Sequence, residues 1–355
     1  MTLYTALRPL LFALPAETAH GLGKRAMKRI QASGVARSLV RRRYRYRHPA
    51  LRTEVFGLEF PTPVGVAAGF DKNGEVTHCL ADLGFGFTEV GTVTPYPQSG
   101  NDRPRLFRLP EDGGMINRLG FNSQGADRVR RRFQELGRPA VPIGLNIGKM
   151  NTSGETEAIE DYRRVFDRLS AYPDYFVVNV SCPNTPEEFA EDDPEHVERI
   201  FETLDDENDA DDPMLVKVGP DSTPEALAEL VDIVESVGFD GIVATNTTTD
   251  HSGLSGRHRG ETGGVSGRPL EATATETVRT LAGLTDLPIV GVGGVRDAAG
   301  AYAKIRAGAS LVQLYTGFVY RGPSTARQIG RGLVSLLERD GFETVGDAVG
   351  ADCDS

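Results

Sequence analysis

Residues 289–317 read IVGVGGVRDAAGAYAKIRAGASLVQLYTG, and they contain the repeating unit that decides the fold. A short apolar run at Ile289–Val292 is followed by a glycine pair, a helix-like segment at Ala298–Arg306 and a second apolar run at Leu311–Tyr315. Two buried-type strands joined by a helix are typical of a parallel βαβ unit. Glycines directly after a strand let backbone N–H groups approach a ligand closely.

The same alternation extends outward from this stretch through most of the chain. Eight short apolar runs recur, at Val64–Ala68, Gly86–Val90, Ile143–Ile147, Phe176–Val180, Met214–Val218, Gly241–Thr245, Ile289–Val292 and Leu311–Tyr315. Helix-like segments lie between most of them, at Thr156–Ser170, Pro224–Val237, Ala272–Ala282 and Ala298–Arg306. Eight such strands over about 250 residues predict an α/β fold, a (β/α)8 TIM barrel. A doubly wound open sheet is the competing arrangement. Polar and glycine residues follow nearly every strand, which favours strand ends that converge on one site.

Residues 1–48 form a separate basic segment, with eleven Lys and Arg residues and one acidic residue. Its apolar residues fall on two helical stripes. The stripes consist of Leu3, Leu7, Leu10, Leu11 and Leu14, and of Leu22, Ala26, Met27 and Ile30. We therefore predict an N-terminal two-helix extension at 1–48, a catalytic barrel at 49–340 and a short C-terminal tail at 341–355.

The extension suits the surface of a membrane rather than its interior. No stretch of the sequence approaches the roughly 20 apolar residues that a spanning helix needs. An apolar helical face beside many basic side chains is typical of a helix that lies in the interface of an anionic membrane. The alternative is that the two helices only cap the bottom of the barrel.

The charge composition indicates an unusual environment. The formal net charge is −11, and only six of the 39 basic residues are lysines. Acid-rich, lysine-poor surfaces suit concentrated salt, where repulsion is screened, so we predict a halophilic archaeal source. A GC-rich genome would explain the arginines but not the acidic excess. Three cysteines make no disulfide framework, and their spacing indicates no metal site.

Glycine-rich loops near the last strands indicate a phosphorylated ligand. A glycine pair follows the seventh strand, Gly317 follows the eighth, and Gly263-Gly264 and Ser266-Gly267 follow the sixth. Barrels commonly bind phosphate at the loops after their last two strands. Lys217, in the fifth apolar strand, could stabilise negative charge on a ligand such as a reduced flavin ring, form a Schiff base, or pair with a core carboxylate.

Amide side chains gather at the other strand ends. Asn146, Asn179, Asn184 and Asn246 offer both donors and acceptors, which suits a ligand with alternating C=O and N–H groups such as a pyrimidine. Cys182, after the fourth strand, is either a reactive thiol or a small buried apolar residue. The long segment that contains residues 117–122 would be a lid or a substrate-binding loop, although Asn117 and Asn122 could equally be turn residues.

Seven long motifs, in this order, resemble the quinone-dependent class of the dihydroorotate dehydrogenase family. They are AAGFDKNGE, EVGTVTPYPQSGNDRPRLFRLPED, INRLGFNSQG, VVNVSCPNT, VATNTT, TGGVSGRPL and GVGGVRDAAGAYAKIRAGASLVQLYTG. The match runs from about residue 3 to about residue 352.

The resemblance implies one FMN per chain. The expected FMN-binding residues are Ala67, Ala68, Gly69, Asp71, Thr92, Asn146, Asn179, Lys217, Thr245, Gly267, Gly294, Tyr315 and Thr316. Dihydroorotate is expected to contact Lys72, Asn117, Arg118, Leu119, Gly120, Phe121, Asn179, Asn184, Asn246 and Thr247.

The implied reaction is the oxidation of (S)-dihydroorotate to orotate in de novo pyrimidine biosynthesis, with electrons passed through FMN to a membrane quinone. A base takes the C5 proton while C6 gives a hydride to flavin N5. Cys182 occupies the base position, where the quinone class usually has serine and the soluble class has cysteine. We expect Cys182 to be the base because a thiol titrates closer to neutrality than a hydroxyl. The sequence departs from the family pattern at a second place. It has Glu187-Glu188-Phe189-Ala190 where the family usually has a Gly-Leu-Arg run, so the details of the active-site lid are expected to differ.

Other functions remain as alternatives. The same dehydrogenase could use a soluble acceptor such as fumarate or NAD, which Cys182 favours and the N-terminal extension opposes. A Schiff-base aldolase would use Lys217 as its nucleophile. Binding of nucleic acid by the basic extension has no recognised fold to support it, so no nucleic-acid partner is expected. We expect a monomer bound peripherally to the cytoplasmic side of the cell membrane.

Overall fold

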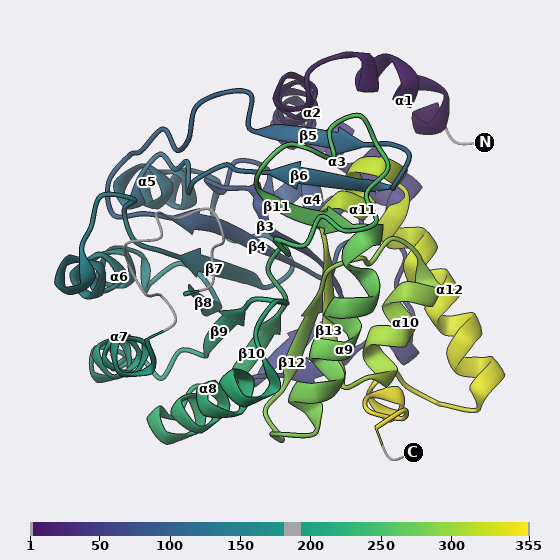
Figure 1. Ribbon diagram of the computed structural model, residues 1–355. Helices are drawn as coiled ribbons and strands as arrows, with labels where there is room; N and C mark the ends of the chain where they lie inside the picture. Colours follow the sequence, from purple (N-terminus) through teal and green to yellow (C-terminus); the bar gives the residue numbers. More distant parts are fainter. Residues whose placement is uncertain (1–2, 181–192, 354–355) are drawn as a thin grey trace.

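The structure is a computed structural model, and it describes residues 3–180 and 193–353 (Figure 1). Its centre is a closed barrel of eight parallel strands in the order β10-β12-β13-β3-β4-β7-β8-β9. The barrel strands are β3 (Val64–Asp71), β4 (Phe87–Val93), β7 (Ile143–Ile147), β8 (Tyr175–Asn179), β9 (Met214–Val218), β10 (Gly241–Ala244), β12 (Ile289–Val292) and β13 (Ala309–Leu314). The last strand, β13, pairs with the first, β3, which closes the barrel. The predicted TIM barrel is therefore confirmed, and the open sheet is wrong.

Helices cover the outside of the barrel (Figure 1). They are α4 (Thr77–Asp82), α5 (Ala126–Leu136), α6 (Glu155–Leu169), α7 (Pro194–Asp206), α8 (Pro224–Val237), α9 (Glu271–Ala282), α10 (Ala298–Arg306) and α12 (Thr325–Asp340). Helix α8 shows why these segments are helical. Thr223 caps its first turn, and Gly238 ends it in the left-handed conformation that glycine adopts without strain. Its buried side chains, Leu227, Val231 and Val234, recur at helical spacing.

The bottom of the barrel is closed by a short hairpin rather than by the N-terminal helices. After a turn of 3-10 helix, η1 (Pro49–Leu51), strands β1 (Thr53–Val55) and β2 (Leu58–Phe60) pair antiparallel. Val55 and Phe60 pack with the side chains inside the barrel, including Phe87 and Tyr175.

Three helices form the N-terminal extension, here called the hood: α1 (Leu3–Ala13), α2 (Ala16–Gln31) and α3 (Gly34–Tyr44). The first two are the helices that the apolar stripes predict. The third covers the basic run, which the apolar pattern did not assign to a helix. The hood lies at the barrel mouth, because His20 of α2 contacts Phe70 at the end of β3 and Tyr315 just after β13. The alternative that the helices cap the barrel bottom is wrong. No helix in the described part of the chain is long and apolar enough to cross a membrane.

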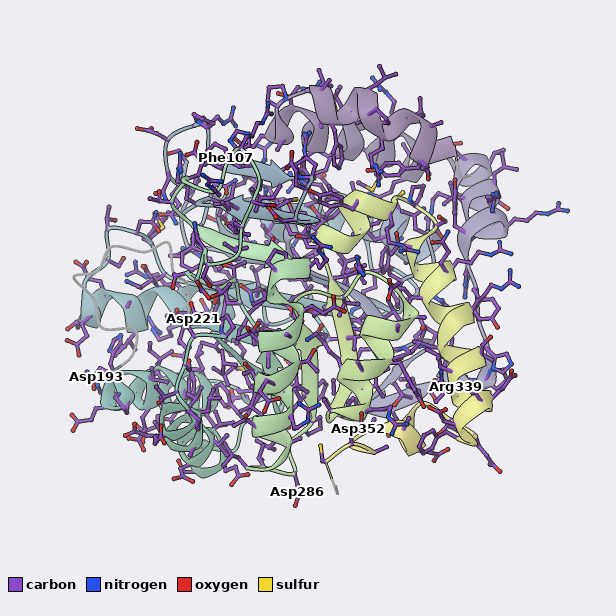
Figure 2. All side chains as sticks on the ribbon, turned by 45° about the vertical axis from the view of Figure 1, so that its right-hand side comes forward. Phe107, Asp193, Asp221, Asp286, Arg339 and Asp352 are labelled. Carbon is purple, nitrogen blue, oxygen red and sulfur yellow. The ribbon has the colours of Figure 1, made fainter. Side chains whose placement is uncertain are left out.

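A three-stranded antiparallel sheet, here called the roof sheet, lies over the same end of the barrel (Figure 1). Its strands are β5 (Leu106–Leu109), β6 (Gly114–Asn117) and β11 (Gly264–Gly267), followed by η2 (Arg268–Leu270). Phe107, Ile116 and Val265 belong to its own apolar cluster. Figure 2 shows Phe107 at the roof end and Asp286 at the opposite end of the molecule.

The chain after β13 folds back onto the barrel. Helix α11 (Thr316–Arg321) leads into α12, and η3 (Gly346–Ala348) follows. The backbone N–H of Val345 donates to the carbonyl of Ala50 at 2.8 Å, and both Val345 and Ala348 are buried. Val345 and Ala348 thus pack this last segment against η1, which precedes the barrel.

Candidate active site

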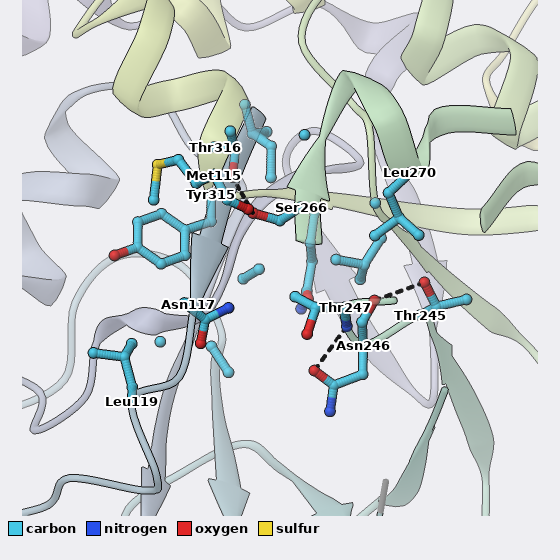
Figure 3. A pocket seen from close by; sticks show the side chains of 18 of the residues that line it. Met115, Asn117, Leu119, Thr245, Asn246, Thr247, Ser266, Leu270, Tyr315 and Thr316 are labelled. Carbon is cyan, nitrogen blue, oxygen red and sulfur yellow. Dashed lines mark hydrogen bonds between the residues drawn. The ribbon is translucent and has the colours of Figure 1, made fainter. Parts of the chain in front are cut away.

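A cavity of about 140 Å³ lies at the carboxyl ends of the barrel strands, beneath the roof sheet (Figure 3). Of the residues expected to bind FMN, it brings together Ala67, Ala68, Gly69, Thr92, Asn179, Lys217, Thr245, Gly267, Gly294, Tyr315 and Thr316. Of those expected to bind substrate, it brings together Lys72, Asn117, Leu119, Gly120, Phe121, Asn179, Asn246 and Thr247. Two expected residues lie outside the described part of the chain, Cys182 and Asn184.

Three expected residues do not line the cavity: Asp71, Arg118 and Asn146. The Asp71 carboxylate accepts two backbone N–H groups of the turn that follows β3. Arg118 directly follows Asn117, and successive side chains of an extended chain point in opposite directions. Asn117 therefore faces the cavity while Arg118 turns away and donates to the Glu261 carboxylate at 2.9 Å. Asn146 lies beneath the cavity, fully buried.

Glu89 of β4 anchors the floor of the cavity from below. Its carboxylate is fully buried and accepts from Asn146 Nδ2 at 2.9 Å and from Gln313 Nε2 at 2.7 Å. Lys217 Nζ lies 3.8 Å from Glu89 Oε1. A buried charge is costly unless it is paired and hydrogen-bonded, and these three partners come from β7, β13 and β9. Glu89 thus fixes side chains from three separate strands.

Lys217 has two roles that sequence patterns left as alternatives. It lines the cavity, and it also pairs with the core carboxylate of Glu89. The ion pair orients the ammonium group, and the cavity wall exposes it to a ligand. The lysine can therefore place a fixed positive charge against an anionic group in the cavity.

A chain of amide and hydroxyl groups runs across the cavity floor. Thr92 Oγ1 donates to Asn146 Oδ1, and Asn179 Nδ2 donates to Thr92 Oγ1 at 3.1 Å. Asn246 Nδ2 lies 3.4 Å from Asn179 Oδ1, and Asn246 Oδ1 accepts the backbone N–H of Thr247 at 2.9 Å. Each amide is oriented by its neighbour, so the donors and acceptors that face the cavity have defined directions.

The roof sheet fixes the upper wall of the cavity. Strand β6 pairs with β11, so that Asn117 lies opposite Gly264 and Gly114 opposite Gly267. Ser266 Oγ is 2.8 Å from Thr316 Oγ1 at the start of α11 (Figure 3). The loops after β4, β10 and β13 therefore form one continuous wall.

A second cavity, of about 350 Å³, lies between the hood and the barrel. Its lining is mostly apolar and includes Leu11, Met27, Ile30 and Phe318. Leu106, Met115 and Tyr315 line both this cavity and the one at the barrel mouth.

Few polar groups lie in the second cavity. Arg108 donates to the carbonyls of Phe12 and Leu14 at 2.8 and 2.9 Å and lies over the Phe12 ring. Burial lowers the pKa of His20 to about 4, with Lys24 acting in the same direction. His20 is therefore neutral near pH 7.

A family model described as dihydroorotate dehydrogenase matches residues 50–337. The chain belongs to the dihydroorotate dehydrogenase family. This confirms the resemblance stated from the seven motifs, and it excludes the aldolase.

Curated relatives cover almost the whole chain. A protein named dihydroorotate dehydrogenase (quinone) from Natronomonas pharaonis is 51% identical over 353 residues, which is 99% of this chain and 100% of the relative. One of the same name from Halobacterium salinarum is 50% identical over 351 residues, or 99% and 100%. Both sources are halophilic archaea, which agrees with the acid-rich composition. A crystal structure of DHODH from Eimeria tenella in complex with ferulenol matches with a TM-score of 0.85 and 35% identity, over 94% of this chain and 95% of that one.

Some residues that line or support the cavity escaped the sequence patterns. Glu89 lies in an apolar run, FTEVGTV, where a single acidic residue gives no sign of which way it points. Gln313 and Met115 also line the cavity, and neither was singled out, although Gln313 lies within the last of the seven motifs. The alternation of β4 predicts that Glu89 shares a face with Phe87 of the barrel interior, and that signal could have found it.

Proposed function

We propose that this chain is an FMN-dependent dihydroorotate dehydrogenase that passes electrons to a membrane quinone, in de novo pyrimidine biosynthesis. The observation that carries the proposal is the pair of cavities that meet at Tyr315. One lies at the barrel mouth and has lysine and amide side chains in its wall. The other is apolar and lies beneath the hood, which suits a hydrophobic electron acceptor.

The cavity at the barrel mouth fits FMN in its shape and its donors. The wall that β3 supplies consists of the small residues Ala67, Ala68 and Gly69, which leave room for a flat ring. Gly267 and Gly294, both with positive φ, bring backbone rather than side chains to the other end, which suits a phosphate. Lys217 would lie against the ring. When bound, FMN would supply the two-electron redox chemistry.

The residues expected to bind dihydroorotate suit an anionic cyclic amide. Lys72 supplies a cation for the carboxylate, while Asn117, Asn179 and Asn246 offer amide donors and acceptors for the ring. The oriented amide chain fixes which ring edge faces the flavin site. Positioning of this kind can supply several kcal/mol of the lowering of a barrier.

Cys182 is proposed as the base that takes the C5 proton. Strand β8 ends at Asn179 in the cavity wall, and Cys182 follows three residues later in the sequence. A thiol needs less activation than a hydroxyl to accept a proton near neutral pH. The proton would leave to Cys182 Sγ as the substrate ring is oxidised.

The hood is proposed to attach the enzyme peripherally to the cytoplasmic face of the cell membrane, as a monomer. Leu10 of α1 and Val35 and Leu39 of α3 are 71%, 74% and 63% exposed. Arg41, Arg42 and Arg43 occupy the last turn of α3. Exposed apolar residues beside basic ones favour an anionic membrane surface. A quinone would then reach the apolar cavity directly from the bilayer.

The proposal is tested by half-reactions of the purified protein. Denaturation should release about one FMN per chain, and dihydroorotate should bleach the flavin without oxygen. A quinone should then reoxidise it faster than fumarate or NAD. Release of FAD, or of no flavin, contradicts the cofactor, and faster reoxidation by a soluble acceptor contradicts the quinone.

Membrane attachment has its own test. Leu10→Asp should weaken binding to vesicles that contain anionic lipid. Leu284→Asp is the matched control, because Leu284 is 40% exposed just after α9, away from the hood. Equal vesicle binding by the two variants would contradict a membrane-facing hood.

A further inference from the structure

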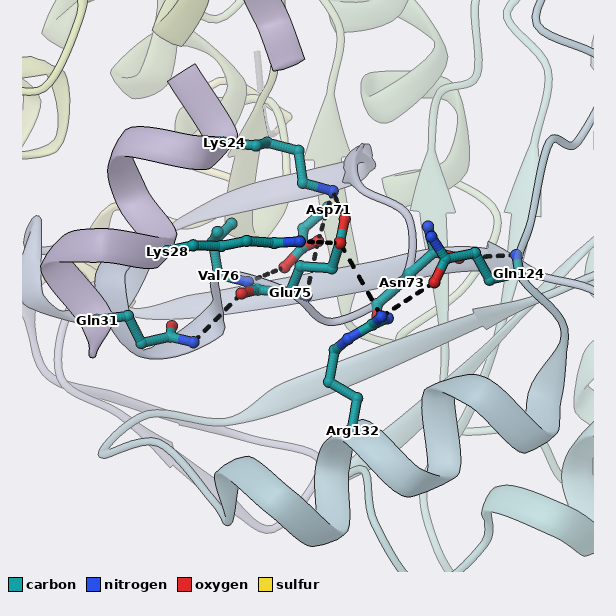
Figure 4. Close-up of polar contacts among 9 residues, drawn as sticks. All are labelled: Lys24, Lys28, Gln31, Asp71, Asn73, Glu75, Val76, Gln124 and Arg132. Atoms are coloured by element: carbon teal, nitrogen blue, oxygen red, sulfur yellow. Dashed lines mark hydrogen bonds and ion pairs between the residues drawn. The ribbon is translucent and has the colours of Figure 1, made fainter. Parts of the chain in front are cut away.

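A polar cluster joins the hood to the turn that carries Lys72 (Figure 4). Here called the hood–loop cluster, it consists of Lys24, Lys28 and Gln31 of α2, Asp71 and Glu75 around the turn, and Arg132 of α5. Lys24 Nζ lies 3.2 Å from Asp71 Oδ1 and also pairs with Glu75. Lys28 pairs with Glu75, and Gln31 Nε2 donates to the Glu75 carbonyl at 3.2 Å.

Asp71 organises this turn through both of its carboxylate oxygens. Oδ1 accepts the backbone N–H of Glu75 at 2.9 Å, and Oδ2 accepts that of Val76 at 2.7 Å. Lys72, which lines the cavity, is the next residue after Asp71. A shift of the Asp71 carboxylate would therefore shift the start of the turn and, with it, the Lys72 backbone.

The far side of the turn is held by the barrel. Arg132 donates to the Asn73 carbonyl at 2.6 Å, and the backbone N–H of Gln124 donates to Asn73 Oδ1 at 2.9 Å. Lys72 thus lies between a fixed point on α5 and a fixed point on the hood.

We propose that Lys24 is a positioning residue for dihydroorotate, because its ion pair with Asp71 holds the turn that places Lys72 in the cavity. This inference rests on the proposed function. It gives the hood a second role: a helix at the quinone side also sets the geometry of the substrate side.

The ion pair between Lys24 and Asp71 is buried, so its loss should disturb the turn. The Asp71 side chain is fully buried and that of Lys24 is 12% exposed. Burial alone would lower the pKa of Lys24, but Asp71 and Glu75 outweigh it and leave the pKa raised. Exposed pairs contribute little, whereas removal of one partner from a buried pair leaves the other charge uncompensated.

Lys28 provides a matched control within the same helix. It is 46% exposed and pairs with Glu75, and in the described structure it forms no ion pair with Asp71. Truncation of the hood would remove the quinone cavity and Lys24 together, so point substitutions are needed to separate the two roles.

The test compares Lys24→Met, Lys24→Gln, Lys24→Arg and Lys28→Met in the full-length, FMN-loaded protein. Anaerobic stopped-flow bleaching at several dihydroorotate concentrations gives an apparent Kd and a limiting rate. The two neutral Lys24 variants should raise the Kd about tenfold, within what a small displacement of a positioning group costs. Lys24→Arg should restore most of the affinity, and Lys28→Met should stay within about twofold of wild type.

The rate at which a quinone reoxidises the reduced flavin separates a positioning role of Lys24 from a merely structural role in the hood. A short-chain quinone should reoxidise the pre-reduced Lys24 variants at the wild-type rate. An unchanged Kd in both neutral Lys24 variants, or a Kd rise of the same size in Lys28→Met, would overturn the inference. Slow reoxidation with an unchanged Kd would also overturn it, because Lys24 would then serve only the hood. If dihydroorotate fails to bleach the wild-type flavin, the proposed function fails instead.

Discussion

Lys304 of α10 is a fully buried lysine whose removal should make the protein more stable. Its Nζ donates to Thr275 Oγ1 at 3.0 Å, and its aliphatic chain lies over Gly291 of β12. Methionine matches this chain in length and carries no charge. The Thr275 hydroxyl keeps a partner in Lys304→Met, because it also donates to the Glu271 carbonyl at 2.7 Å.

The pKa of this lysine sets the expected gain. Burial lowers it from its ordinary value of 10.5 to about 7, with Glu271 acting in the opposite direction. At about 1.4 kcal/mol per pKa unit, this corresponds to about 5 kcal/mol of stability lost when the amine is protonated in the folded chain.

The gain should depend on pH in a defined direction. Below about pH 7 the amine is protonated in both the folded and the unfolded chain, so the full cost is present. Between about pH 7 and pH 10.5 the folded chain releases the proton while the unfolded chain keeps it, so wild-type stability rises with pH. The advantage of Lys304→Met should therefore fall by about 3 kcal/mol between pH 6 and pH 9.5.

Urea unfolding of both proteins, at pH 6 and pH 9.5 with the same salt and the same excess of FMN, measures this difference. Other groups that titrate in the window are shared by both proteins and cancel in the comparison. An advantage of equal size at both pH values, or a variant that is less stable than wild type at pH 6, would refute the reasoning.

Three further predictions concern the site and the thiols. Lys217→Met should weaken FMN binding and lower the free energy of unfolding, because it leaves the buried Glu89 without its cation. The double variant with Glu89→Gln should recover the stability, measured by denaturation, but not the FMN affinity, measured by flavin titration. Cys182→Ala should slow flavin bleaching by roughly 10²–10⁴-fold with FMN still bound, and Cys182→Ser should retain more activity at higher pH; an Ala variant within about threefold of wild type would assign the proton to another group. Burial raises the pKa of Cys79 to about 12, so iodoacetamide at pH 8 should modify the partly exposed Cys353 and leave Cys79 unlabelled by mass spectrometry.

The sequence was most informative where each residue acts through its own neighbours. Strands with apolar runs, such as Ile289–Val292, and helices with end signals, such as Thr223 and Gly238, follow from local rules. The glycines and amides at the strand ends were found because a barrel brings all these ends to one face.

What escaped prediction depends on contacts between distant segments. The roof sheet pairs short strands that lie far apart in the chain, and nothing near Gly114 indicates that Gly267 will pair with it. Asp71 was expected at the cofactor, but its carboxylate is committed to the turn and to Lys24 of the hood. Arg118 was grouped with its neighbours by motif, although the pleat of the chain turns it away from the cavity.

The roof sheet also sets the order in which the protein can become functional. Asn117 and Gly264, which lie side by side in it, are 147 positions apart in the chain. Closing so long a loop is slow, and its entropic cost is not offset until the segment between its ends has folded and formed its own contacts. Ser266 in turn needs Thr316, which a ribosome adds only after all eight barrel strands. A nascent chain therefore has no complete cavity until synthesis is almost finished, so a ligand of this cavity would bind full-length molecules in preference to shorter fragments.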